Sequence, residues 1–576
     1  MRMPLTWLLV GVAATLVGCV ETEVYRCGAE RSCGEGTCES TGLCSFPDVS
    51  CPDGRRYGSL SGALADQCVS ADLPDGGGGD GAVDAGASDG ASPDGPGPDA
   101  GACDLGTPCL SGVMSQGRCV YTPVSGACED GLACTRGDIC SGGVCLAGAW
   151  DNGFGACSSA SVPIYRSVGP SMSTPLASGG GNPLRIRGET ATFAVALPVQ
   201  VGVGDVIQYD ANDDGVVDSL AFIHGRTSST VFTVRDTEGG YPRPTQQDDG
   251  DWLLMRSYIS LAAALAMTEN TSIAAGLRDF ESCGPSCDLV SRHRSFHIAA
   301  YADAVDLARV FVTSWRADAR NWLTIFTPTR PDQVGVSQRH DGTWGTGYRR
   351  TQGIDIQVPF VRLDGLSLRV DELDRVYLIG LDQGRSGEVE IAHSYAEMAH
   401  PTTWFRVYDV FGTNPVLVRV SNSIGISRST ASDSYVFYNN QGTSQAYFYN
   451  CTGMAVGGVV FQKDQGPMEV VNGLGVITGT GVAYRGLQTA TDVVTYSVSS
   501  DASLGAWPTG NNRASQTIRF VNLAGGDLHL SASDTAAHDR GSNLTGSAAI
   551  TIVDDVDGQP RPALPTTWDI GADELP

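Results

Sequence analysis

The chain alternates between apolar and polar positions in short bursts over most of its length, which is the pattern of β-strands. Runs of four to seven residues such as "VYLIGL", "EVEIAHS" and "YVFYNN" recur from about residue 297 onward, each broken by Gly, Asn, Asp or Ser. Similar runs occupy the stretch from about residue 165 to 248. Short strands separated by turn-forming residues indicate a mainly β fold.

Asparagine recurs directly after apolar runs, at Asn422 ("VRVSN"), Asn450 ("YFYN") and Asn472 ("EVVN"), 28 and 22 residues apart. This spacing suits the turns of a solenoid with loops of variable length. Stacked asparagines can hydrogen-bond along a ladder, because each amide carries donors and an acceptor. A two-sheet sandwich would also allow short strands, but the recurring asparagine favours a parallel β-helix.

One stretch changes period. In "DWLLMRSYISLAAALA", residues 251–266, apolar side chains fall at helical spacing, so we expect one helix there. A β-helix end exposes unpaired strand edges, and this helix is placed to cap the N-terminal end. We therefore predict a small β subdomain at 165–250, followed by the capping helix and β-helix at 251–576.

The first residues indicate export. Arg2 precedes an apolar stretch at 5–17 that is too short to span a bilayer, and small residues lead into Cys19. Residues 1–18 are therefore predicted to be a lipoprotein signal peptide and Cys19 the lipidated residue, because two or three acyl chains anchor a protein stably in a membrane. Val20 after the cut favours the outer membrane. The alternative is an ordinary secretory signal with an incidental Cys19.

Setting Cys19 aside leaves seventeen of the 18 cysteines, fourteen of which gather in two Gly-rich stretches. Six lie within 27–68 and eight within 103–157. Even counts in compact exported segments imply disulfides, with a pairing that the sequence leaves open. Zinc is the alternative, although neither stretch contains a histidine. We expect Cys-rich modules at 19–71 and 103–164.

The composition also predicts a linker, and three cysteines besides Cys19 lie outside the two Cys-rich stretches. Residues 72–102 are rich in Asp, Gly, Ala and Pro and nearly lack large apolar side chains, so we expect a disordered linker. Cys283 and Cys287 form a close pair, and Cys451 in "AYFYNCTGM" is predicted to be a buried free thiol.

Acidic residues outnumber basic ones by 64 to 37, giving a net charge of −27. No basic stripe exists to replace phosphate counterions, which argues against nucleic acid as a partner. Calcium fits the charge better. In "DANDDGVVD", residues Asp210, Asn212, Asp214 and Asp218 take positions 1, 3, 5 and 9 of an EF-hand-like loop, but Ala221 replaces the usual glutamate at position 12. The prediction is a weak Ca²⁺ site, and the alternative is an Asp-rich hairpin turn.

Several aromatic and charged residues are candidates for binding or cleaving a carbohydrate. Trp344 and Tyr348, in the Gly-rich "HDGTWGTGYRR", are candidate surface contacts for a sugar, whereas Trp315 and Trp322 lie in strand runs and are predicted to be core. A polysaccharide lyase or glycoside hydrolase would need carboxylates converging across a groove. The segment "RLDGLSLRVDELDR" offers such groups, and a solvated salt-bridge face is the alternative: Arg362, Asp364, Arg369, Asp371 and Asp374.

The chain end, "DLHLSASDTAAHDRGSNL…TIVDDVDGQPRPALPTTWDIGADELP", carries a Leu-His-Leu strand at 528–530, a D-x-D-G-x-P-R-P turn at 555–562 and D-I-G-A-D-E at 569–574. It resembles the C-terminal segment of bacterial right-handed parallel β-helix (pectin lyase-like) proteins of the choice-of-anchor Q type. The stretch from about residue 165 onward is similar to the N-terminal part of such proteins. The resemblance implies a β-helix carried on a membrane anchor and implies no agreed activity.

Together these observations predict a lipid-anchored, outer-membrane or cell-surface protein. Its fold class is mainly β: a right-handed parallel β-helix with an N-terminal β subdomain and one capping helix, preceded by disulfide-rich modules. We expect non-catalytic binding or scaffolding of a polysaccharide or another surface polymer. The alternative is a polysaccharide lyase or glycoside hydrolase acting on an acidic polysaccharide.

Overall fold

The computed structural model describes residues 37–38, 44–47, 55–57, 103–116, 118–151, 157, 161–281, 283, 286–371, 375–381, 384–401, 405–488, 490–547 and 550–576. The predicted signal peptide, Cys19 and the linker at 72–102 lie outside these residues. The chain divides into two compact units, 1–94 and 95–576. In the first unit, three strands pair antiparallel: β1 (Thr37–Cys38), β2 (Cys44–Pro47) and β3 (Arg55–Tyr57).

The second unit begins with the Cys-rich module. Its strands are short antiparallel pieces: β4 (Leu110–Ser115), β5 (Arg118–Pro123), β6 (Thr135–Arg136), β7 (Ile139–Ser141), β8 (Val144–Leu146) and β9 (Ala149–Trp150). Four disulfides hold them: Cys103–Cys119, Cys109–Cys140, Cys128–Cys145 and Cys134–Cys157. The predicted disulfide framework is confirmed for this module, whose strands are too short to enclose a large core.

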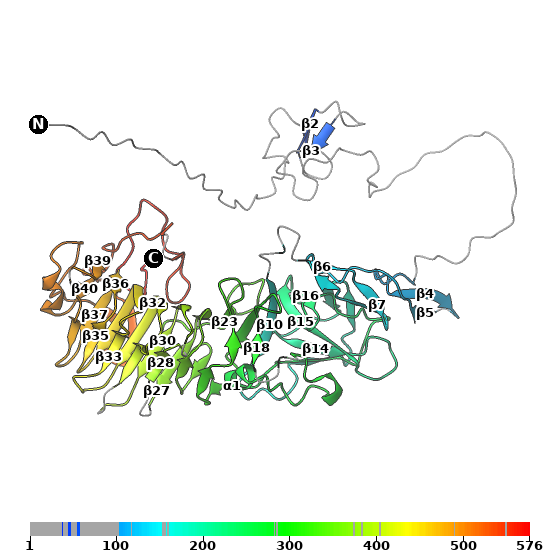
Figure 1. The fold of residues 1–576 in the computed structure, drawn as a ribbon, viewed down its shortest axis with the longest axis horizontal. Helices are drawn as coiled ribbons and strands as arrows, with labels where there is room; N and C mark the ends of the chain where they lie inside the picture. Colours follow the sequence, from blue (N-terminus) through cyan, green and yellow to red (C-terminus); the bar gives the residue numbers. More distant parts are fainter. Residues whose placement is uncertain are drawn as a thin grey trace, which may run out of the picture. The chain divides into compact units, whose positions relative to one another are not determined.

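Most of the second unit is a parallel β-helix, whose coils run from green to orange in Figure 1. Each full coil contributes one strand to each of three ladders, and the strands within each ladder pair in parallel. The first ladder contains β10 (Val162–Val168), β19 (Arg294–Ala300), β23 (Leu323–Phe326), β26 (Val361–Asp364), β29 (Gly387–Ala392), the first halves of β32 (Val416–Ser427) and β34 (Gln445–Ala455), β36 (Met468–Val471) and β39 (Val493–Thr495). This architecture confirms the predicted fold class.

The other two ladders complete the coil. The second contains β20 (Val305–Asp306), β24 (Arg349–Arg350), β27 (Ser367–Val370), β30 (Tyr395–Met398), the second halves of β32 and β34, β37 (Leu474–Ile477) and β40 (Val498–Ser499). The third contains β21 (Val310–Val312), β25 (Ile354–Ile356), β28 (Arg375–Ile379), β31 (Arg406–Val410), β33 (Tyr435–Asn440), β35 (Val459–Gln465) and β38 (Val482–Arg485). A separate parallel pair joins β18 (Cys287–Asp288) to β22 (Trp315–Arg316).

Inward side chains form one continuous apolar core along the coil. Its clearest feature is a stack of aromatic rings contributed by successive strands of the third ladder, with neighbouring ring centroids 4.8 to 5.2 Å apart. That distance is close to the spacing of paired strands, so in-register pairing places ring upon ring. The stacked residues are Tyr377, Tyr408, Phe437, Phe461 and Tyr484.

An antiparallel sheet is inserted between the first two strands of the coil. Its strands follow the order β11 (Ala177–Ser178), β17 (Leu253–Met255), β14 (Val206–Tyr209), β15 (Ser219–Arg226), β16 (Val231–Arg235), β13 (Thr190–Phe193) and β12 (Leu184–Arg187). It has a core of its own. Tyr165, expected to begin this subdomain, lies instead in β10, which pairs with β19 of the coil. The chain therefore starts the coil, leaves it to build the inserted sheet, and returns.

The helix expected at 251–266 is much shorter in the structure. Leu253–Met255 form β17, which pairs with β14 and β11, and α1 spans only Leu261–Leu265. Sheet pairing overrides the helical spacing at Leu253 and Leu254, and Ser260 starts the helix by accepting the N–H of Ala263. Leu261 is buried in the coil core, so the helix closes part of its first turns. Among the described residues, no helix is long and apolar enough to cross a membrane.

The chain ends in a segment that folds back along the coil, shown in red in Figure 1. It follows the 3-10 helix η4 (Ala502–Ala506) and contains β41 (Phe520–Asn522), the 3-10 helix η5 (Leu523–Gly525) and β42 (Asp527–Leu530). Another 3-10 helix, η3 (Ala275–Leu277), lies earlier in the chain, after α1. Leu528 and Leu530 pack on outward side chains of the second ladder, including Ile424 and Leu474. The protein thus covers that face of its coil with its own C-terminal segment.

Candidate functional site

The corner between the first and second ladders carries the predicted asparagine ladder. Asn422, Asn450 and Asn472 have positive φ angles of 44°, 50° and 54°, a conformation that asparagine tolerates better than most residues. Asn450 Nδ2 donates to Asn422 Oδ1 at 3.2 Å, and Asn472 Nδ2 donates to Asn450 Oδ1 at 2.7 Å. All three side chains are buried, so these bonds replace lost water contacts. The prediction of stacked asparagines is confirmed.

His393 takes the same corner position one coil earlier. Its Nδ1 lies 2.7 Å from Asp364 Oδ1 and its Nε2 lies 2.9 Å from Asp554 Oδ1, while Arg339 donates to Asp364 at 3.0 Å. Burial lowers the pKa of His393, but the two carboxylates outweigh it and the net pKa is raised. Burial raises the pKa of Asp364, but His393 and Arg339 bring it down to about 2. A protonated His393 therefore ties Asp554 of the C-terminal segment to the coil.

The three C-terminal motifs lie together within that segment. Arg561 Nη1 donates to Glu574 at 2.6 Å, the N–H of Glu574 donates to Asp555 at 3.1 Å, and the N–H of Leu530 donates to Asp573 at 2.6 Å. These contacts join 528–530, 555–562 and 569–574 into one polar network. Its place against the corner indicates a structural role as a cover.

The arginines and aspartates of "RLDGLSLRVDELDR" that the structure describes do not converge on one point. Arg362 pairs with a glutamate on the first ladder at 2.6 Å, and Asp364 is held at the corner. Arg369 lies 3.7 Å from Asp371 at the end of the second-ladder strand β27. Asp374 lies outside the described residues. The salt-bridge alternative accounts for the described members, because each carboxylate already faces a cation.

One rank of outward side chains follows the first ladder across five adjacent strands. Arg362, Glu390, Arg419, Tyr447 and Glu469 occupy directly paired positions, and we call this rank the outer ribbon. Arg362 Nε donates to Glu390 at 2.6 Å, and Arg419 Nη1 lies 3.8 Å from Glu390. The ribbon is therefore a surface of alternating charge with an aromatic ring in it.

Trp322, just before β23, lies beside Arg362 at the start of the ribbon, although the residue of β23 that pairs directly with Arg362 is the buried Thr324. The guanidinium carbon of Arg362 lies 4.9 Å from the centroid of the Trp322 ring, within the range of a cation–π contact. Trp322 was expected in the core, but it is only partly buried, because it precedes β23 and its Nε1 donates to Ala319 at 3.1 Å outside the coil. Trp315, by contrast, is buried as expected.

The predicted calcium loop joins β14 to β15. The Asp210 carboxylate accepts the N–H groups of Asn212 at 3.0 Å and Gly215 at 2.6 Å. Asp214 accepts the side-chain amide of Asn212 at 3.0 Å, and Asp218 pairs with Arg243. These contacts are those of an Asp-rich turn, and a cation would have to compete with them. The Ca²⁺ site stays a prediction.

The two candidate sugar contacts lie in different environments. Trp344 is partly exposed, with the guanidinium carbon of Arg349 6.0 Å from its ring centroid. Tyr348 is fully buried, and its hydroxyl donates to Asp306 at 2.8 Å. Arg350 also donates to this hydroxyl, at 3.0 Å, so the ring is held inside the coil and is closed to a sugar.

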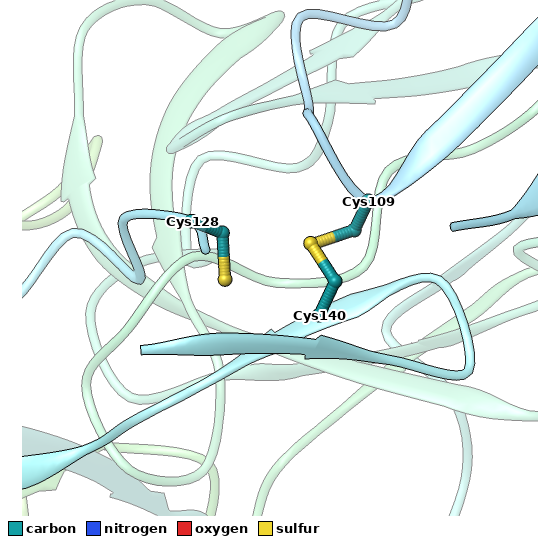
Figure 2. Close-up of side chains that lie close together, drawn as sticks. All are labelled: Cys109, Cys128 and Cys140. Atoms are coloured by element: carbon teal, nitrogen blue, oxygen red, sulfur yellow. A yellow bond between two sulfur atoms is a disulfide. The ribbon is translucent and has the colours of Figure 1, made fainter. Parts of the chain in front are cut away.

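The Cys-rich module brings three sulfur atoms close together. Figure 2 shows Cys109 and Cys140 joined by their sulfurs, with Cys128 beside them. Cys128 is itself bonded to Cys145. Zinc binds thiolates, so sulfurs already joined in disulfides do not offer a zinc site, and the zinc alternative fails for these residues.

The expectation of a buried free thiol at Cys451 is confirmed. Its sulfur lies 3.4 Å from the backbone oxygen of Tyr449, and burial raises the pKa of the thiol far above its ordinary value. A neutral buried thiol is a poor nucleophile.

Sequence reasoning missed two adjoining clefts where the Cys-rich module, the inserted sheet and the first ladder meet. One has a volume of about 470 Å³ and the other about 260 Å³, and both are lined by Tyr165 and His224. Their walls come from segments far apart in the chain, including Trp150 and Arg330. No local motif marks them.

No family model, no curated protein and no solved structure matches the chain. The parallel β-helix is therefore identified by its strand pairing alone, and the likeness of the C-terminal motifs to choice-of-anchor Q proteins stays a prediction.

Proposed function

We propose that this protein is an exported, lipid-anchored protein of the outer membrane or cell surface that binds or scaffolds a polysaccharide or another surface polymer without cleaving it. The observation that supports this most is the outer ribbon. It offers a repeating line of guanidinium, carboxylate and aromatic groups over successive strands about 4.8 Å apart. A long polymer can contact such a surface at many points, and weak contacts then add up.

The state of the carboxylates favours binding over catalysis. A glycosidase needs one carboxylic acid that stays protonated and a second carboxylate across a groove. Asp364 has a pKa of about 2, which is the opposite of what a general acid requires. Glu390 is held between Arg362 and Arg419. These carboxylates are paired, whereas a catalytic pair would converge on a bond.

A retention experiment tests the binding. The purified chain carrying Cys19→Ser, which removes the lipid anchor, is run through gels containing acidic or neutral polysaccharides. We expect retention by at least one polymer, weakened about three- to tenfold by Tyr447→Ala, since a stacked aromatic ring contributes about 1 kcal/mol. Phe311→Ala, an exposed ring on the third ladder, is the matched control and should leave retention unchanged. Equal mobility of all variants in every gel would contradict the proposal.

The anchor is tested separately. Cys19→Ala should move the protein from the membrane fraction to the soluble fraction and abolish incorporation of radiolabelled palmitate. A membrane-bound Cys19→Ala chain would favour a different anchor.

A further inference from the structure

The two adjoining clefts have walls suited to a sugar ring. Trp150 lines the larger cleft and stacks on His293 with centroids 4.5 Å apart and planes 2° apart. Tyr165 lines both clefts and stacks on His297 at 4.7 Å. Both rings are only partly buried, and sugars pack their apolar faces on aromatic rings.

Three polar atoms in these walls have no hydrogen-bond partner among the described residues. They are Trp150 Nε1, His224 Nε2 and Arg235 Nη1. Burial, followed by Arg166 and Arg235, lowers the pKa of His224 well below 6.5, so its ring is neutral. Unpaired buried polar groups cost free energy, so these wall residues carry polar groups whose hydrogen-bonding capacity the fold itself does not use.

The charge of the clefts is opposite to that of the protein as a whole. The chain has 64 acidic and 37 basic residues, yet the described residues lining the clefts include three arginines and a single acid, Asp332. Arg330 pairs with Asp332 at 3.0 Å. Arg235 pairs with Glu189 through Nη2, while its Nη1 is the unpaired nitrogen. Arg226 has no carboxylate partner among the described residues and is partly exposed. A free guanidinium in a concave site attracts anions.

We propose that these two adjoining clefts together bind an anionic oligosaccharide, with a carboxylate or sulfate group at Arg226 and sugar rings against Tyr165 and Trp150. This inference rests on the proposed polysaccharide binding and adds the charge of the sugar and a second place of contact. The combined size is that of ordinary small-ligand sites, which also occur where domains meet. A guanidinium holds a carboxylate or a sulfate through two parallel hydrogen bonds.

Calorimetric titration of the whole chain carrying Cys19→Ser tests this. The probes are a uronic acid tetrasaccharide, a sulfated neutral tetrasaccharide, and the uronic acid tetrasaccharide with its carboxylates reduced to alcohols. We expect one of the two anionic probes to bind and the reduced probe to bind at least about tenfold more weakly, because a charge-assisted hydrogen bond is lost. The better anionic probe identifies the group as carboxylate or sulfate.

Arg226→Gln should weaken binding of that probe about tenfold and reduce its salt dependence. Arg316→Gln, an exposed arginine outside the clefts, is the matched control and should leave the affinity unchanged. Matching circular dichroism spectra and unfolding midpoints show that both variants fold.

Three results would overturn the inference: an unchanged affinity in Arg226→Gln, equal binding of the reduced probe, or an equal loss in Arg316→Gln. The proposed function fails separately, when no polymer is retained by the wild-type chain or when Tyr447→Ala retains it as well as the wild type does.

Discussion

The parallel β-helix and the inserted antiparallel sheet build their cores differently. In the coil, like rings stack face to face, with Phe437 and Phe461 at 4.9 Å and 16°. In the inserted sheet, Phe193 meets Phe232 and Trp252 edge-on, at 85° and 67°. Parallel in-register strands repeat the same environment every strand, whereas antiparallel strands must fit side chains of different shape.

This difference extends to the surfaces. Repetition gives the coil a regular outer ribbon along the first ladder, suited to a repeating polymer. The insertion interrupts the repeat after β10, and the clefts lie at that interruption. The regular region offers extended contacts, and the irregular junction offers a concave site.

The largest expected effect comes from the aromatic stack. Phe437→Ala should lower the free energy of unfolding by about 3 to 5 kcal/mol, because it leaves a cavity between two rings. Urea denaturation followed by circular dichroism measures it. Phe193→Ala is the comparison and should weaken the inserted sheet while leaving hydrogen-exchange protection of the third ladder unchanged. A loss below about 1 kcal/mol for Phe437→Ala would contradict the continuous core.

The corner is next. Asn450→Ala should cost about 2 to 4 kcal/mol, because it removes two buried side-chain hydrogen bonds and places alanine at positive φ. Asn450→Gly relieves the backbone strain but not the lost hydrogen bonds, so it should recover about half of the loss. If glycine is no better than alanine in denaturant titration, the backbone part of this explanation is wrong.

The stability that the C-terminal segment gains by contacting the corner should depend on pH through His393. The pKa of His393 is raised in the folded state, so its contribution is complete below about pH 6.5 and is lost as pH rises through the folded pKa. The free energy of unfolding of the wild-type chain should exceed that of His393→Gln by about 1.5 to 3 kcal/mol at pH 6. The difference should shrink as the pH rises through the raised pKa of His393.

Thermal unfolding of the wild-type chain and of His393→Gln at several pH values measures the difference in their stability. His538→Gln, with a side chain 40% exposed, is the control for the loss of a histidine from the surface. A difference that grows with pH would show that the neutral form of His393 is the stabilising one.

The smallest expected effect is at the predicted calcium loop. Calorimetric titration should show binding with a dissociation constant of about 10⁻⁴ to 10⁻³ M, as in weak extracellular sites, and Asp214→Ala should remove the heat signal. An absence of heat in the wild-type chain would leave the loop as an Asp-rich turn.

The sequence predicted what repeats locally and failed where distant contacts decide. An asparagine after three successive apolar runs marked the corner, because one side chain serves the same role in those coils. Leu253 and Leu254 fitted helical spacing, but pairing with β14 and β11 made them a strand. The burial of Tyr348 depends on Asp306, 42 residues away. The clefts had no sequence signal, because their walls meet only in the fold.

The central functional claim is that the protein holds a polysaccharide without cutting it. The most direct test is an end-group assay on the purified chain incubated with each polysaccharide that it retains. We predict no reducing or unsaturated ends above those formed with heat-denatured protein. Turnover that continues over many cycles and disappears in Asp371→Ala would contradict the account and identify the protein as an enzyme.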